Sequence, residues 1–207
     1  MKLYLAPLEG ITNHIYRKAL YQCFGGFDKY FIPFIRAKQN LNFSGREKKD
    51  ISPENNLGMY AVPQILTKNA DDFLQTANQL REYGYQEVNL NLGCPSKTVV
   101  TKGCGAGFLD RPEELERFLD KIFSGTDMRI SVKTRLGMED AEGFPHLMEI
   151  YNRFPMEELI IHPRVQKDFY KNIPDLEVFG EALACSRHPV CYNGDIFSSG
   201  DFRRISE

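Results

Sequence analysis

The chain has 207 residues, enough for one domain with a sizeable buried core. Hydrophobic residues make up 42% of it and charged residues 26%, as in soluble globular proteins, and no stretch approaches the roughly 18 apolar residues of a membrane span. The net charge of −2 argues against a globally basic surface for nucleic acid.

The N-terminus and the cysteines bear on the compartment. Pro7 and Glu9 interrupt the first ten residues too early for a signal peptide, so we expect a cytoplasmic protein. An odd number of cysteines, five, argues against a disulfide framework there. Because no Cys-x-x-Cys occurs and no histidine stands at zinc-finger spacing from Cys94 and Cys104, no metal site is predicted.

Short apolar runs alternate with amphipathic stretches along the chain. Most of the runs are rich in β-branched or aromatic residues, as buried parallel strands are. The predicted strands are Lys2–Ala6, Lys29–Ile35, Met59–Leu66, Gln86–Asn91, Met128–Lys133, Glu157–His162 and Pro189–Asn193.

Helical patterns fill the gaps, and three of them are distinct. One begins after the N-cap Asn69 and stops at Gly84. A second has Pro112 early, acidic residues in its first turn, and Gly125 at its end. A weaker third covers Pro174–Ser186. A last helical start follows the seventh strand.

Strand and helix, repeated about seven times, predict a parallel α/β fold, either an open doubly wound sheet or a closed barrel. Nearly every predicted strand ends in polar or charged residues. In a barrel these ends converge on one mouth, where active sites lie, so their even distribution favours a TIM-type (β/α)8 barrel. We expect residues 1–207 to form one barrel domain that lacks its eighth strand, as a fragment or with the gap closed by another element.

Several strand ends carry candidate binding residues. Lys133, His162 and the turn Asn193–Asp195 would all reach the barrel mouth. Barrels hold phosphate on the loops after strands seven and eight, so this set suggests a phosphorylated cofactor such as flavin mononucleotide (FMN). The basic stretch Arg36–Asp50 reads as a solvated loop on charge alone. Cys94, alone, would read as a small buried hydrophobic residue.

Five segments in this order resemble the tRNA-dihydrouridine synthases. They are APLEG at Ala6–Gly10, NLGCPSK at Asn91–Lys97 with GCGAGFL at Gly103–Leu109, SVKTRLG at Ser131–Gly137, IHPR at Ile161–Arg164, and NGDI at Asn193–Ile196. The resemblance spans almost the whole chain. It implies an FMN-binding barrel that reduces the C5–C6 double bond of uridines in tRNA, with NADPH as electron donor.

The resemblance also implies roles for individual residues. The residues expected to contact the flavin are Pro7, Leu8, Glu9, Gln64, Lys133, His162, Asn193, Gly194 and Asp195. Asn91 would hold the flipped-out uracil, and Cys94 would be the catalytic acid. A thiol has an unperturbed pKa of about 8.5, so it is protonated at neutral pH yet able to give up its proton.

The remaining expectations concern the loops and the RNA. Arg36, Arg135 and Arg164 are candidates for holding RNA or uracil, and the stretch after Arg36 for contacting tRNA phosphates. Gly93 and Pro95 would fix the Cys94 loop. The glycines that would let backbone approach the substrate closely are Gly103, Gly105 and Gly107.

The chain departs from the family pattern in three ways. Leu8 replaces a methionine, and Pro163 replaces a glycine after His162. The eighth strand and a C-terminal helical tRNA-binding domain are absent from these residues, so we expect weak flavin retention and poor tRNA turnover. A monomer without metal or membrane partner is expected. The alternatives are another FMN barrel enzyme acting on a small molecule and a non-enzymatic RNA-binding paralogue.

Overall fold

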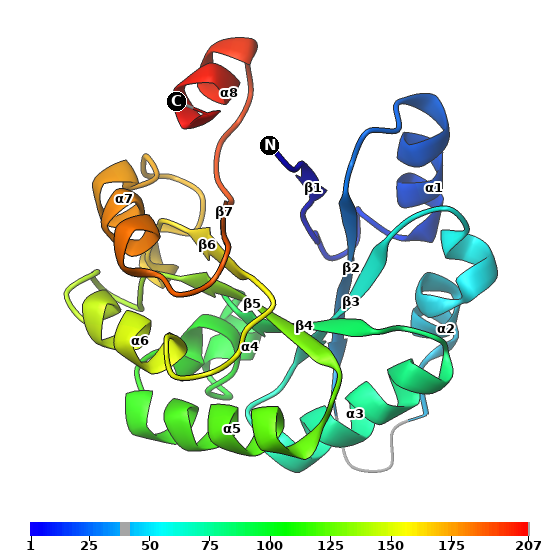
Figure 1. Cartoon of the computed structure of the whole chain (residues 1–207), viewed down its shortest axis with the longest axis horizontal. Coiled ribbons are helices and arrows are strands. Elements are labelled where there is room, and N and C mark those ends of the chain that lie inside the picture. Colours follow the sequence, from blue (N-terminus) through cyan, green and yellow to red (C-terminus); the bar gives the residue numbers. More distant parts are fainter. Residues whose placement is uncertain (38–41, 207) are drawn as a thin grey trace. The chain divides into compact units, whose positions relative to one another are not determined.

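The computed structural model describes residues 1–37 and 42–206, and they form two compact units (Figure 1). The N-terminal unit comprises residues 2–91 and 121–130. The C-terminal unit comprises Met1 and residues 92–120 and 131–206. Each unit is a parallel sheet with helices, and each is described in turn.

The sheet of the N-terminal unit has four strands in chain order. They are β1 (Tyr4–Leu5), β2 (Lys29–Arg36), β3 (Ala61–Leu66) and β4 (Glu87–Leu92), all parallel, with Gln64 opposite Asn89. The helices are α1 (His14–Cys23), α2 (Gly45–Ile51), the 3-10 turn η1 (Pro53–Asn56) and α3 (Ala70–Glu82). Asn69 caps α3 as predicted, by accepting from the Asp72 amide.

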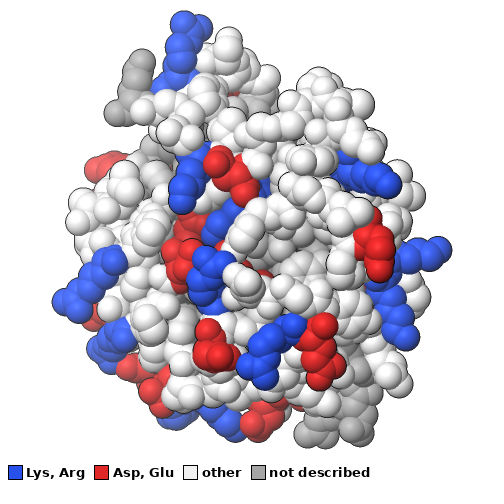
Figure 2. Space-filling view, turned by 45° about the vertical axis from the view of Figure 1, so that its right-hand side comes forward, with Lys and Arg blue, Asp and Glu red and all other residues white. Residues whose placement is uncertain are grey.

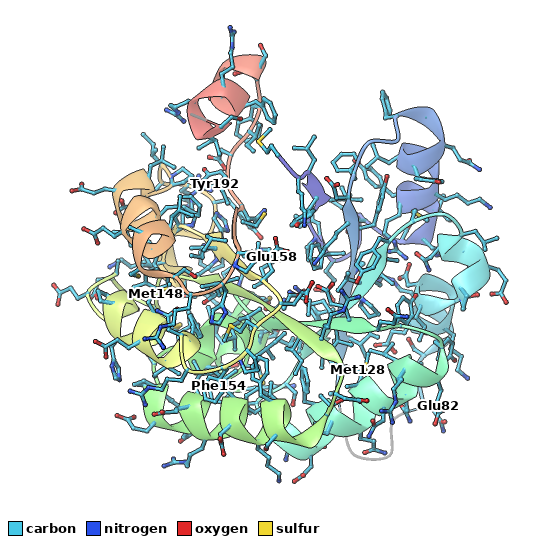
Figure 3. All side chains as sticks on the ribbon, in the orientation of Figure 1. Glu82, Met128, Met148, Phe154, Glu158 and Tyr192 are labelled. Atoms are coloured by element: carbon cyan, nitrogen blue, oxygen red, sulfur yellow. The ribbon has the colours of Figure 1, made fainter. Side chains whose placement is uncertain are left out.

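The C-terminal unit contains β5 (Arg129–Arg135), whose first two residues belong to the other unit, β6 (Leu159–His162) and β7 (Val190–Tyr192), again parallel. Its helical elements are α4 (Lys97–Val100), η2 (Gly105–Phe108), α5 (Pro112–Gly125), α6 (Phe144–Tyr151), η3 (Gln166–Asp168), α7 (Leu176–Cys185) and α8 (Ser199–Ser206). The last five residues of α5 belong to the N-terminal unit. Tyr192, labelled in Figure 3, packs edge to face on Phe179 of α7, with ring centroids 5.2 Å apart.

The strand order confirms the predicted fold class. Seven strands follow one another in chain order, and helices connect them, as in a TIM-type (β/α)8 barrel. All seven predicted strands form, and each end lies within two residues of its expected place. None of the helices among the described residues is long and apolar enough to cross a membrane.

The sequence pattern does not predict helices α1 and α6, for a different reason in each case. In α1 the buried residue is Arg17, while Ile15 is 66% exposed. The apolar residues of α1 therefore do not mark its buried face, and their spacing does not predict the helix. Helix α6 has only eight residues, about two turns, which is too short for its buried and exposed residues to show a clear helical period.

The solvated-loop interpretation of Arg36–Asp50 is wrong for its second half. Residues 38–41 of this stretch lie outside the described residues. Beyond them, Ser44 and Glu47 form a reciprocal capping box that starts α2. The helix ends in a buried carboxylate, Asp50, which accepts the His14 amide at 2.6 Å and lies 3.6 Å from the Arg17 guanidinium.

Figure 2 shows basic and acidic side chains interspersed on the face that it presents. Exposed ion pairs include Arg81–Asp127 and Lys121–Asp71. Exposed pairs of this kind contribute little to stability, because water and salt screen them.

Candidate active site

The candidate site of the C-terminal unit begins with the face of β5 that carries Lys133 and Arg135. Side chains two residues apart in a strand share a face, and Arg135 is in register with His162 of β6. The residue between them, Thr134, faces the other way and makes a 3.0 Å hydrogen bond with Tyr151 of α6. The three predicted residues therefore lie together on the face away from that helix.

Lys133 shares this face of β5 with Arg135. Within residues 1–37 and 42–206 its ammonium group makes no hydrogen bond or ion pair. Burial, followed by the nearby charge of Arg135, lowers the pKa of Lys133 to about 8, and the nearby Cys191 and Cys94 thiols partly offset this. A lysine held in this way favours an anionic partner.

His162 is oriented by Arg164 and kept neutral mainly by its burial. The Arg164 guanidinium donates through Nη1 to His162 Nε2 at 3.0 Å. Burial, followed by the charges of Arg135, Lys133 and Arg164, lowers the pKa of His162 to about 2. The imidazole is therefore neutral at every physiological pH.

Arg164 also holds Asp195, on the turn after β7. Its Nη1 donates to Asp195 Oδ1 at 2.9 Å and its Nη2 to the other carboxylate oxygen, while its Nε donates to the Asn172 carbonyl at 2.5 Å. This hydrogen bond lowers the pKa of Asp195, and burial opposes it. Asp195 is thus an internal anchor, and its expected flavin contact stays a prediction.

The rest of the Asn193–Asp195 turn packs on its own unit. The Asn193 amide donates to the Ile161 carbonyl at 2.9 Å, which continues the pairing of β7 with β6. A Cβ on Gly194 would overlap the Tyr192 hydroxyl, so a larger residue there would require the Tyr192 side chain to move. The expected flavin contact of Asn193 and Gly194 stays a prediction.

Arg135 has a different environment from the one expected for an RNA contact. It is 1% exposed, and its Nε, Nη1 and Nη2 donate to the carbonyls of Gly93, Val165 and Phe169 at 3.0, 2.9 and 2.7 Å. The ring of Tyr170 lies 5.4 Å from its guanidinium carbon. Arg135 and Arg164, which is 2% exposed, are therefore both buried and hydrogen-bonded within the protein, and their expected role in holding RNA or uracil stays a prediction.

Cys94 is half-buried on the loop between β4 and α4. The glycine-rich segment that follows packs back on this loop. A Cβ on Gly105, which has φ of +56°, would lie 2.8 Å from the Cys94 carbonyl oxygen, and one on Gly107 would lie 2.6 Å from that of Val100. Gly105 and Gly107 are both buried against the protein's own backbone. Their expected close approach to substrate, with that of Gly103, stays a prediction.

The N-terminal unit contains three hydrogen-bonded side-chain amides, those of Gln64, Asn89 and Asn91, called here the amide row. Gln64 of β3 donates through Nε2 to Asn89 Oδ1 at 2.7 Å, and Asn91 donates through Nδ2 to Gln64 Oε1 at 2.7 Å. All three side chains are at most 7% exposed. The sequence predicted Gln64 and Asn91 as site residues but did not predict Asn89. Its two-residue spacing from Asn91 is the signal that could have found it.

The other predicted residues of this unit are more open. Pro7 is half-buried, and Leu8 and Glu9 are exposed; the amide of Leu8 is held by Thr12 Oγ1 at 2.8 Å. Arg36 is half-buried, with its guanidinium carbon 5.6 Å from the Phe34 ring centroid. Their roles stay predictions. Among the described residues no cluster of three or more His, Cys, Asp or Glu side chains could hold a metal ion.

Comparison with known proteins identifies the family. The dihydrouridine synthase (Dus) family model matches residues 4–207. The tRNA-dihydrouridine(16) synthase of Pseudomonas syringae pv. tomato is 29% identical over 100% of this chain and 67% of its own length, and that of Cupriavidus necator is 28% identical over 98% and 65%. The tRNA-dihydrouridine synthase B of Pasteurella multocida is 24% identical over 96% and 59%. The chain thus spans about two thirds of the length of these relatives. It belongs to the dihydrouridine synthase family.

Proposed function

We propose that this protein takes part in the flavin-dependent reduction of uridine in tRNA to 5,6-dihydrouridine, with FMN as cofactor, NADPH as electron donor and the cytoplasm as its location. Family membership and the names of the relatives support the reaction class. The observation that carries the proposal for this chain is the cationic face of β5 and β6, where Lys133 has no counterion.

The residues of this face fit a flavin. Lys133 can place a positive charge beside the electron-rich ring or its ribityl chain, and this interaction would relieve the cost of its burial. His162 accepts from Arg164 at Nε2, so its proton lies on Nδ1 and can be donated to a ligand oxygen. A cation and a neutral donor on one strand face suit a phosphorylated, electron-rich ligand.

The amide row of the N-terminal unit suits the uncharged parts of the ligands. Isoalloxazine and uracil each present carbonyl and N–H groups along one edge. We propose that Gln64 hydrogen-bonds the flavin ring and that Asn91 holds the uracil. The hydrogen bonds that link these side chains to each other and to Asn89 fix the direction of each amide before a ligand binds.

Cys94 is proposed as the proton donor. When bound and reduced by NADPH, the flavin supplies a hydride to C6 of the uracil. Cys94 then transfers its thiol proton to C5, and solvent reprotonates the sulfur. Lys133 is close enough to Cys94 to interact with it electrostatically, so its positive charge favours the thiolate that this step leaves.

The proposal is tested with two cysteine variants. Cys94→Ala should bind FMN like the wild type, seen in its visible absorption spectrum, but lose tRNA-dependent dihydrouridine formation by about 10²–10⁴-fold. The matched control is Cys104→Ala, ten residues on, which should stay within about twofold because no role is assigned to it.

Other results would point elsewhere. Equal activity of wild type and Cys94→Ala would overturn the acid assignment. Reduction of free uridine or an enone at the same rate with and without tRNA would indicate a small-molecule reductase. A folded sample that binds tRNA but no FMN, even with excess cofactor, would indicate a binding module.

A further inference from the structure

Three consecutive carbonyl groups around Cys94 each accept a hydrogen bond from a different segment. Arg135 Nε donates to the Gly93 carbonyl at 3.0 Å, the Ala106 amide to that of Cys94 at 3.1 Å, and Gln166 Nε2 to that of Pro95 at 2.8 Å. We infer that Gln166, together with Arg135, is a positioning residue that holds the Cys94 loop in one conformation. This inference rests on the proposed function only for its effect on catalysis.

Gln166 is itself held firmly enough to act as a clamp. It is 8% exposed and begins η3, just after β6. Its backbone amide donates to the Gly137 carbonyl at 2.9 Å, and the next amide, that of Lys167, donates to the Met138 carbonyl at 3.2 Å. The Gln166 side chain therefore connects the Cys94 loop to η3, and the η3 backbone is bound in turn to the loop that follows β5.

Arg135 also connects the Cys94 loop to the η3 segment. Besides the Gly93 carbonyl it binds those of Val165 and Phe169, on either side of Gln166. A guanidinium can donate in three fixed directions in one plane, which a lysine ammonium on a flexible stem cannot reproduce. The buried Arg135 guanidinium therefore orders the Cys94 loop and the η3 segment. This role accounts for the position of Arg135 better than an RNA contact does.

The backbone at Phe169 supports this interpretation. Phe169 is the one described non-glycine residue with positive φ, at +52°. A backbone in this region is unfavourable for a side chain with a Cβ and persists only where its surroundings hold it. Its carbonyl accepts the 2.7 Å hydrogen bond from Arg135, so Arg135 stabilises the strained turn while it binds the Cys94 loop.

A thiol that must protonate one carbon atom of a bound base needs a fixed position. Misplacement by about 1 Å can lower such a step about a hundredfold. Loss of the Gln166 hydrogen bond should therefore lower kcat for dihydrouridine formation, while the KM for tRNA and the Kd for FMN stay unchanged, because Gln166 contacts neither ligand in this assignment.

The test uses Gln166→Met, which keeps the size of the side chain and removes its donor. Amide hydrogen exchange, measured by NMR, reports the loop directly, because the Ala106 amide is bonded to the Cys94 carbonyl. We expect this amide to exchange about fivefold faster in Gln166→Met, as for the loss of one hydrogen bond. The amide of Val132 in β5, bonded to the Glu158 carbonyl, should keep its rate.

Two controls make the result decisive. Lys167→Ala changes the next residue of η3, which is exposed, and should leave the Ala106 exchange rate unchanged. Gln166→Asn, one methylene shorter, serves if the methionine variant does not fold. No change at Ala106, or an equal acceleration at Ala106 and Val132, would overturn the clamp. If the wild-type chain forms no dihydrouridine, the proposed function fails, and the exchange measurement still tests the clamp.

Discussion

Arg164 fixes the tautomer of His162. A guanidinium has donors only, so the 3.0 Å contact between Arg164 Nη1 and His162 Nε2 requires the imidazole nitrogen to accept. The single ring proton must then lie on Nδ1. The bidentate contact of the same guanidinium with Asp195 holds this arrangement in place.

The first prediction is that His162 does not titrate in the folded chain between pH 5 and 8. Its pKa is lowered to about 2, against a usual value of about 6.5. Between these values the unfolded chain binds a proton that the folded chain does not, so this residue makes stability fall as the pH drops below about 6.5. Imidazole ¹⁵N shifts should show a neutral Nδ1–H ring across the range, with His162→Gln identifying the signal. A ring that becomes protonated near pH 6 would contradict the arrangement.

The second prediction concerns Lys133, where stability and ligand binding should change in opposite directions. Below pH 8 the lysine is protonated in both the folded and the unfolded chain, and its burial without a counterion destabilises the fold. Lys133→Met should therefore raise the free energy of unfolding at pH 7 by about 1–3 kcal/mol. The same variant should weaken FMN binding about tenfold or more, because a charged hydrogen bond is lost.

The pH dependence of the wild type provides the control for Lys133. As the pH rises from about 8 towards 10.5, the folded lysine loses its proton before the unfolded one. The free energy of unfolding of the wild type should therefore rise relative to that of Lys133→Met over this range. FMN binding by the wild type should weaken over the same range, and binding by Lys133→Met should not. A variant that binds FMN like the wild type at pH 7 would remove Lys133 from the flavin site.

The third prediction separates two glycines of the C-terminal unit. Gly105→Ala should destabilise the chain by several kcal/mol, since its Cβ would lie 2.8 Å from the Cys94 carbonyl oxygen at a φ of +56°. Gly180, inside α7, has no atom within 4 Å of an added Cβ, so Gly180→Ala should stabilise by about 0.5–1 kcal/mol. Urea unfolding measures both. Equal effects would show that Gly105 does not pack on the Cys94 loop.

The sequence predicts this fold well because its signals are local. Buried parallel strands appear in the sequence as short apolar runs. The two-residue spacing of Lys133 and Arg135 places both side chains on one face of β5, independently of the rest of the fold. The partners of these side chains are not local. Arg135 binds backbone carbonyls 42, 30 and 34 residues away. Because every residue has a backbone carbonyl, the residue type at these positions does not predict the contact. For the same reason the sequence does not predict Gln166 as a residue that binds the Cys94 loop, nor which carbonyls Arg135 binds.

The N-terminal unit contains a buried ion pair between Lys29 and Glu87. Lys29 and Glu87 are 9% and 2% exposed, and Lys29 Nζ lies 3.0 Å from each Glu87 carboxylate oxygen. Tyr60 donates its hydroxyl proton to Glu87 Oε2 at 3.0 Å, and Arg129 in turn donates to the Tyr60 oxygen at 2.7 Å. The carboxylate is therefore the centre of a chain of charged hydrogen bonds.

The fourth prediction is that the two halves of this pair are strongly coupled. Glu87→Gln leaves the Lys29 ammonium buried without a counterion and should lower the free energy of unfolding by about 3–5 kcal/mol. Replacing both partners, as Lys29→Met with Glu87→Leu, removes the charges together with their desolvation penalty and should be the more stable of the two variants. Urea unfolding of wild type, single and double variants measures the difference. If the double variant is no more stable than Glu87→Gln, the destabilisation comes from lost packing and hydrogen bonding at Glu87 and not from an isolated buried charge.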